Sequence, residues 1–160
     1  MNNNSKSSSL KFIRNKISKN LVPIFFSFYK KDYLKDKNKI ITEIQRNYKE
    51  SIILRSSAVD EDGKIKSNAG KYDSLIVKKK EFYELQKKIE FILKKLKNNL
   101  DEIIVQKLIV KPEISGVVFT KDKNTDSHYY DINFDVSKKT DLVTSGKYNP
   151  SIKNLIIFKN

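Results

Sequence analysis

The sequence predicts an α+β domain in which a mostly antiparallel sheet is flanked by helices. Helical and strand-like segments are mixed in the first part of the chain, and the later part is mostly strand-like. The 160 residues, 38% of them hydrophobic, are enough to bury a core and correspond to about one domain. We therefore expect one domain over residues 10–160, preceded by a disordered, polar N-terminal segment, residues 1–9.

Three segments have the periodicity of amphipathic helices. Apolar residues at helical spacing in residues 10–17 predict a short helix with Ser9 as its N-cap and an end near Asn20. A second helix is expected over about residues 32–48. The third, residues 80–98, has the most regular apolar stripe, with lysines opposite, and is expected to pack on a sheet. This stripe consists of Phe82, Leu85, Ile89, Ile92 and Leu96.

Short apolar or alternating segments predict the strands. In residues 22–28 the presence of Pro23 restricts any strand to a sheet edge or to the residues that follow the proline. The other expected strands are residues 52–55, 72–77, 103–110, 115–120, 129–134 and 154–158. Because no segment repeats another, we expect a single sheet-and-helix domain and no repeat architecture.

The composition limits the classes of function. The net charge of +14 suggests nucleic-acid binding, but the excess is lysine on the polar faces of helices, and nucleic-acid surfaces favour arginine and exposed aromatic residues. We therefore rank nucleic-acid binding as the less favoured class. The chain has no cysteine, no long apolar run and no signal-peptide pattern, so we expect a cytoplasmic location and no membrane partner.

The most informative local pattern begins at the end of the strand expected over residues 52–55. Arg55, one of only three arginines, is followed by two serine hydroxyls and a glycine-containing loop. A guanidinium can hold phosphate oxygens in a bidentate fork, which lysine cannot do. The local sequence equally allows an arginine at a strand end that pairs with Asp60 or Glu61 in the next loop.

Four segments in this order resemble the N-terminal ATP-grasp nucleotide-binding domain of the pyruvate phosphate dikinase and phosphoenolpyruvate synthase family. The resemblance covers about residues 50–150. Within the family, the pattern in this chain looks most like the N-terminal part of the L-glutamine kinases encoded with capsule and surface-polysaccharide genes. It implies an incomplete ATP-grasp-like fold and ATP-dependent phosphoryl transfer through a mobile histidine. The matching segments are Arg55-Ser56-Ser57-Ala58 with Glu61-Asp62 and Asn68-Ala69-Gly70, then Val105-Gln106-Lys107-Leu108, then Ser115-Gly116-Val117-Val118-Phe119-Thr120, and last Val143-Thr144-Ser145-Gly146.

On the phosphate side, the resemblance implies that Arg55 binds the ATP phosphates and stabilises charge on the transferred group. Ser56 and Ser57 are expected to support it with hydroxyls or backbone N–H groups. Gly70 is expected to let its loop fold over the nucleotide. Arg55 is therefore the expected catalytic residue.

On the adenine side, the resemblance implies that Gln106 and Leu108 lie at a hinge where backbone groups and apolar side chains hold the ring. The alternative for this segment is a plain core strand, and for the Leu108 side chain the two interpretations are nearly balanced. Ser115, Gly116 and Thr120 are expected to shape the remainder of the pocket.

The sequence also departs from the family pattern. Lys121 stands where many relatives have arginine, and Thr125-Asp126 replaces a Thr-Gly turn. The family's Asp-Ile-Glu carboxylates for Mg²⁺ are expected beyond Asn160, and the only histidine, His128, does not match the phosphohistidine motif and is expected at the surface. We thus expect no metal ligands within this chain and a separate chain or domain that supplies the carboxylates and the phosphohistidine.

The resulting hypothesis is an ATP-binding part of a phosphotransferase, incomplete by itself. A truncated gene, a split subunit and a retained binding module all fit this expectation. The alternative is a non-catalytic remnant that acts as a protein-interaction module. The absence of the Gly-x-x-x-x-Gly-Lys-Ser/Thr pattern argues against a P-loop NTPase.

Overall fold

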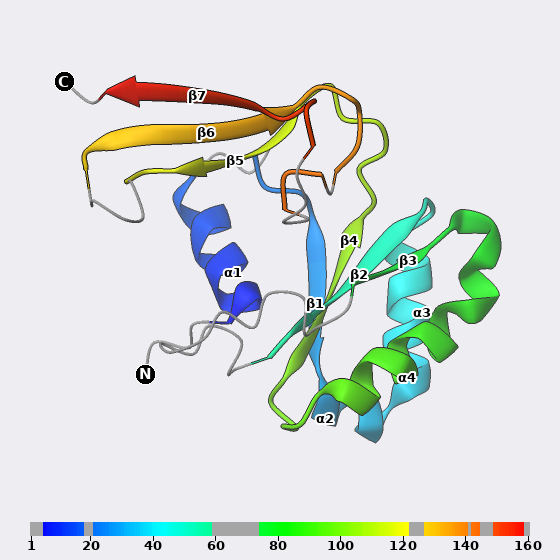
Figure 1. Ribbon diagram of the computed structural model, residues 1–160. Coiled ribbons are helices and arrows are strands. Elements are labelled where there is room, and N and C mark those ends of the chain that lie inside the picture. The colour runs from blue at the N-terminus through cyan, green and yellow to red at the C-terminus, as the bar shows by residue number, and fades with distance from the viewer. Residues whose placement is uncertain are drawn as a thin grey trace. The chain divides into compact units, whose positions relative to one another are not determined.

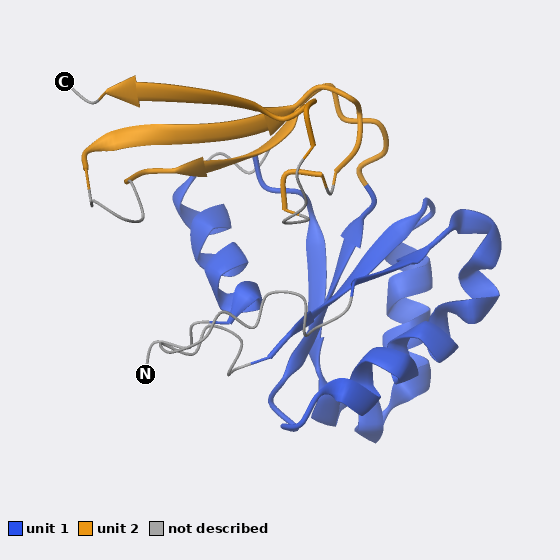
Figure 2. Ribbon diagram, in the orientation of Figure 1, with its two compact units in different colours: residues 1–108 blue, residues 109–160 orange. Residues whose placement is uncertain are grey.

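The chain folds into two compact units, residues 1–108 and 109–160, where the sequence had suggested one domain (Figure 2). The computed structural model describes residues 5–17, 21–58, 74–121, 127–140, 142–144 and 149–158. Each unit contains an antiparallel sheet, and the first unit also contains helices. The predicted α+β class with antiparallel sheets and flanking helices is therefore confirmed.

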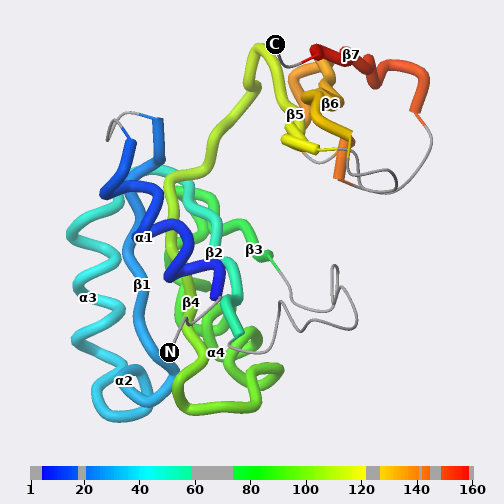
Figure 3. Tube along the Cα trace, turned by 90° about the vertical axis from the view of Figure 1, so that its left-hand side faces the viewer, coloured from blue at the N-terminus to red at the C-terminus, as the bar shows by residue number. Residues whose placement is uncertain are grey.

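The first unit is a four-stranded sheet with helices on both faces (Figures 1 and 3). Its strands lie in the order β1-β4-β2-β3, and every neighbouring pair is antiparallel. The strands are β1 Phe25–Tyr29, β2 Ile52–Ser57, β3 Ser74–Val77 and β4 Glu102–Lys107. The helices are α1 Lys6–Lys16, α2 Lys30–Lys35, α3 Lys37–Asn47, the 3₁₀ helix η2 Lys79–Glu84 and α4 Leu85–Lys95.

The core lies between this sheet and helices α3 and α4. Strand alternation directs Ile52 and Leu54 of β2 toward the helices, and both are fully buried. The apolar stripe predicted for residues 80–98 is confirmed: Leu85, Ile89, Ile92 and Leu96 are buried, and Phe82 packs against them. The stripe forms because residues three and four positions apart lie on one side of a helix.

Edge strand β1 follows Pro23, as expected for a proline that lacks a backbone donor. Its neighbour, β4, is a central strand in which the five residues from Glu102 to Gln106 are all buried. Both faces of β4 are therefore covered. Its two buried polar side chains, Glu102 and Gln106, must find hydrogen-bond partners within the protein.

The single helix expected over residues 32–48 is in fact two, α2 and α3, separated at Asp36. The Asp36 carboxylate accepts a hydrogen bond from the backbone N–H of Lys39 at 3.0 Å and so caps α3. Aspartate favours this position over a helix interior because its side chain competes for nearby backbone donors. The helix expected over residues 80–98 likewise begins as 3₁₀ structure in η2 and becomes α-helical at Leu85.

Helix α1 begins at Lys6, one turn earlier than predicted. Its N-cap is Ser5, whose side chain accepts a hydrogen bond from the backbone N–H of Ser8 at 3.2 Å. Ser9, the predicted cap, lies inside the helix. The run of serines offers several competing caps, and contacts with the sheet decide among them.

The second unit is a three-stranded antiparallel sheet in the order β5-β6-β7. Its strands are β5 Ser115–Phe119, β6 Tyr129–Asp135 and β7 Lys153–Phe158. At Gly116 the neighbouring strand comes so close that an added Cβ would lie 2.6 Å from the backbone oxygen of Asn133. Glycine is therefore required there by strand pairing within this unit.

Truncating the core at Ile44, which is fully buried, should destabilise the first unit by about 2–5 kcal/mol, because a cavity is added to the lost burial. Chemical denaturation of Ile44→Ala and of the control Ile24→Ala measures this difference. Ile24 is 69% exposed, so its variant should stay close to the parent chain. Equal losses in the two variants would contradict the assigned core.

Gly116→Ala should destabilise the pairing of β5 with β6 by about 1–3 kcal/mol, since the new methyl group meets backbone atoms that must move. Faster amide hydrogen exchange in β5 and β6, with the first unit unchanged, is the expected result. Val118→Thr on the same strand is the control, because Val118 is 55% exposed and threonine suits a strand. Unchanged exchange in Gly116→Ala would show that the close approach is absent.

Candidate functional site

The sheet face opposite the core carries two of the four predicted phosphate-side residues. Side chains alternate along a strand, so Arg55 and Ser57 of β2 lie on the face opposite Leu54. Glu102 and Gln106 of β4 occupy the same face, because Ser57 is paired with Glu102 in the strand register. The structure thus brings Arg55, Ser57 and Gln106 onto one surface.

Arg55 and Gln106 are in contact across the two strands. Arg55 Nη1 donates to Gln106 Oε1 at 3.5 Å, and Gln106 is only 7% exposed. Within the described part of the chain, the Arg55 guanidinium forms no ion pair with a carboxylate. The alternative partners Asp60 and Glu61 lie outside the described residues.

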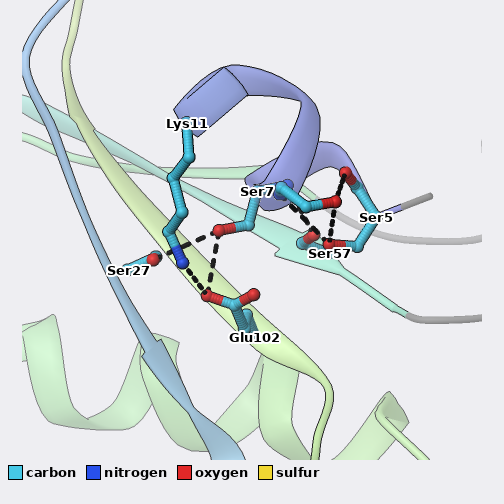
Figure 4. Close-up of polar contacts among 7 residues, drawn as sticks. Ser5, Ser7, Lys11, Ser27, Ser57 and Glu102 are labelled. Carbon is cyan, nitrogen blue, oxygen red and sulfur yellow. Dashed lines mark hydrogen bonds and ion pairs between the residues drawn. The ribbon is translucent and has the colours of Figure 1, made fainter. Parts of the chain in front are cut away.

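Helix α1 covers the other end of this face (Figure 4). The backbone N–H of Ser7 donates to Ser57 Oγ at 3.0 Å, and the Ser7 hydroxyl donates to Glu102 Oε2 at 2.9 Å. Lys11 Nζ lies 3.0 Å from the same carboxylate oxygen, and the Ser27 hydroxyl is hydrogen-bonded to that of Ser7 at 3.2 Å. We call Ser7, Lys11, Ser27, Ser57 and Glu102 the α1 cluster.

The α1 cluster neutralises a carboxylate that is largely removed from water. The Glu102 side chain is 7% exposed, and a buried charge is costly unless it is paired and hydrogen-bonded. Among the described residues of α1, Ser7 alone is buried, whereas Phe12, Ile13 and Ile17 at or near the helix are exposed. The helix is therefore held on the sheet mainly by polar contacts.

Other predicted residues on these strands lie elsewhere. Ser56 points to the core face, where its hydroxyl is buried and has no hydrogen-bond partner among the described residues. Leu108 follows β4, and its backbone N–H donates to the Ser51 oxygen at 2.9 Å. Gly70 lies outside the described residues. The hydroxyl of Ser56 thus does not share a surface with Arg55.

The three residues expected to shape the remainder of the pocket belong to the second unit, which is described by itself. Ser115 donates its hydroxyl hydrogen to the Lys139 oxygen at 2.6 Å, and Gly116 meets the strand-pairing requirement given above. Thr120 directly follows β5. His128 is exposed at a bend before β6, as predicted for a surface residue.

Sequence reasoning missed the α1 cluster and a second polar group at Asp135. Asp135 is fully buried and accepts hydrogen bonds from the hydroxyls of Ser137 at 2.5 Å and Ser151 at 2.7 Å. These bonds, that from Ser137 above all, lower the pKa of the carboxyl below its ordinary value. An acidic residue that begins or ends an apolar strand, as Glu102 and Asp135 do, was the available signal.

No family model, curated protein or solved structure matches this chain. Among the described residues, no helix is long and apolar enough to cross a membrane, and no three acidic or histidine side chains gather as a metal site would require. The only support for the family resemblance is therefore the set of sequence motifs given above.

Lys11→Met should loosen α1 from the sheet, because it removes the cation beside Glu102 while keeping most of the side-chain length. The lysine is half-exposed but the carboxylate it leaves behind is buried, so the cost should exceed that of a surface pair and reach about 1–3 kcal/mol, seen as at least a few-fold faster hydrogen exchange of α1 amides. Lys16→Met is the control, since Lys16 lies on the same helix and contacts the ring of Phe12 instead. Equal exchange in the two variants would contradict the role assigned to the α1 cluster.

Proposed function

We propose that the chain is an ATP-binding part of a phosphotransferase of the pyruvate phosphate dikinase and phosphoenolpyruvate synthase type, with Arg55 as its phosphate ligand. The observation that carries the proposal is the position of Arg55. Its guanidinium lies on the sheet face opposite the core, beside Gln106 and without a carboxylate partner among the described residues. An arginine held on a sheet surface with its charge unneutralised is suited to an anionic ligand.

The location of Gln106 adds support. Its side chain and that of Arg55 come from adjacent strands and lie within 3.5 Å of each other, so two of the four family motifs meet on one surface. The Arg55 and Gln106 motifs are far apart in the sequence. A shift of one residue in the pairing of either strand would have put the two side chains on opposite faces of the sheet. In this proposal the Mg²⁺ ligands and the phosphohistidine come from a separate chain or domain. Within the family, we propose the subgroup of L-glutamine kinases.

A second candidate, a non-catalytic protein-interaction module, is favoured by one observation. Neither serine of the Arg-Ser-Ser motif presents a hydroxyl beside Arg55 for a ligand. Ser57 Oγ accepts a hydrogen bond from the backbone N–H of Ser7, and the Ser56 side chain faces the core. In that case the motif serves the fold, and the polar sheet face receives a polypeptide in place of a nucleotide.

Mg-ATP should stabilise the parent chain, whereas Arg55→Gln should lose this effect. Ligand at about 100 times its dissociation constant adds about 2.7 kcal/mol of stability, which corresponds to a thermal shift of about 5–10 °C. Arg55→Gln keeps an amide donor for Gln106 but removes the charge, so its fold should be retained. A thermal-shift titration with ATP, ADP and adenosine measures these differences.

Arg46→Gln is the matched control, because Arg46 is an exposed arginine in the last turn of α3. Mg-ATP should raise the melting temperature of Arg46→Gln as much as that of the parent chain. Adenosine should leave the melting temperature of both proteins unchanged. Absence of an ATP shift in a parent chain that melts cooperatively would overturn the nucleotide proposal and favour the interaction module. A shift that survives equally in Arg55→Gln would remove Arg55 from the site.

A further inference from the structure

Strand β1 is an edge of the sheet in the first unit, so among the described residues no strand pairs with its outer side. Two adjoining hollows of about 410 and 490 Å³ lie beside β1 and share Lys11, Phe26 and Ser27 in their walls. The first hollow touches Lys11 of α1 on one sheet face and Ile40 of α3 on the other. Because it reaches both faces, the space passes around the edge of the sheet. We call these two hollows the β1 groove.

The pairing of β1 with β4 determines which backbone groups face the β1 groove. Directly after β1, the backbone N–H of Lys30 donates to the Asp101 oxygen at 2.8 Å and so points toward β4. In an antiparallel pair, successive residues alternate between bonding to the partner strand and pointing away from it. Phe28 therefore bonds to β4, whereas the N–H and C=O of Ser27 and the N–H of Tyr29 point outward.

The other neighbour of β4 leads to the same alternation. The backbone N–H of Leu108 donates to the Ser51 oxygen at 2.9 Å, so the even-numbered residues of β4 bond to β2. The odd-numbered residues are left for β1, and one of them, Ile103, is in register with Phe28. Within the described ranges no group bonds to the outward N–H and C=O of Ser27.

The sequence of β1 lacks two features by which edge strands avoid pairing with another chain. Charged residues and prolines within an edge strand commonly block such pairing. Strand β1 has neither, and four of its five residues are aromatic. Only Phe28 is fully withdrawn from solvent, and the other four residues are half-buried. The outer side of β1 is therefore a template for a further extended segment.

The charge of the β1 groove differs between its two ends. At the Phe25 end the wall includes Lys11 and Arg14 and no carboxylate. Lys11 is paired with Glu102, but Arg14 is half-buried and forms no ion pair or hydrogen bond with any residue that the structure describes. Toward α2 and α3 the wall carries acidic and basic residues together. An acidic group is thus favoured at the Phe25 end.

We propose that the β1 groove binds an extended peptide segment of a partner protein, which adds to the sheet as a further strand beside β1. Backbone groups of the peptide pair with those of Ser27 and Tyr29, and an acidic residue of the peptide lies beside Arg14. Backbone pairing supplies the affinity, while the acidic residue fixes the position of the peptide. The site does not depend on nucleotide binding, because Arg55 lies on β2, two strands away from β1.

Three acetylated and amidated peptides test the backbone pairing by calorimetric titration of the full chain. The first, Asp-Thr-Val-Thr-Val-Thr-Asp, carries an acidic residue at each end and therefore fits in either direction. The second is N-methylated at both valines and the third at the threonines. Because only alternate N–H groups of a bound strand face β1, one methylated peptide should bind at least about tenfold more weakly and the other like the first. Equal affinities of all three, or no binding of the first to a folded chain, would overturn the proposal.

Amide hydrogen exchange locates the bound strand. In the free chain the amides of Ser27 and Tyr29 should exchange at least about tenfold faster than that of Phe28, which bonds to β4. Saturation with the first peptide should slow the Ser27 and Tyr29 amides by about tenfold or more. Binding without this protection would overturn the assignment. A dimer of the chain that protects both amides without peptide would mean that a second copy fills the groove, which would also overturn it.

Variants test the acidic end of the peptide. Arg14→Gln should weaken binding of the first peptide about fivefold, yet leave unchanged the binding of an analogue with asparagine in place of both aspartates. The matched control is Arg46→Gln, since Arg46 is exposed and does not line the β1 groove. It should bind both peptides as the parent chain does. Equal affinities of the two variants for the first peptide would overturn the role of Arg14.

Discussion

The burial of β4 on both faces is the constraint on which the rest of the first unit depends. On one face Ile103 and Val105 complete the apolar core, which requires no partners beyond close packing. On the other face the same strand buries Glu102 and Gln106, whose polar groups must be hydrogen-bonded. Helix α1 supplies the donors for Glu102, and β2 supplies Arg55 for Gln106. The position of a helix near the N-terminus and the orientation of the motif arginine thus follow from two polar side chains of one strand.

A feature of this fold could be predicted when the interactions that determine it are local in the sequence. The α4 stripe and strand β2 were predictable because their periodicity is local and strong. The split at Asp36 had a local signal, an aspartate within a helical pattern, that the apolar spacing outweighed. The early start of α1 also had a local signal, the capping serine Ser5, but the run of serines left the cap undecided. The hydroxyl of Ser7, which bonds to a residue 95 positions away, favours the earlier start. Long-range polar contacts of this kind leave no periodic trace in a sequence.

The candidate site was predictable in part for the same reason. The arginine, the serines and Gln106 were identified from their motifs, and the period of two along β2 places Ser56 on the face opposite Arg55. Motif reasoning treated the two serines alike because it used residue type and order without alternation. The α1 cluster depends on residues brought together from a helix and three strands, so only the folded arrangement reveals it.

The contact between Arg55 and Gln106 is compatible with both a structural and a ligand-binding role for the arginine, and its geometry shows why. At 3.5 Å it is at the outer limit of hydrogen-bond length, and the glutamine is neutral, so it orients the guanidinium without neutralising it. Among the described residues no other hydrogen bond or ion pair engages the remaining donors of the guanidinium fork. A carboxylate in place of Gln106 would have formed a strong ion pair with the guanidinium. A neutral side chain at this position of a buried strand therefore keeps the arginine in place without forming an ion pair with it.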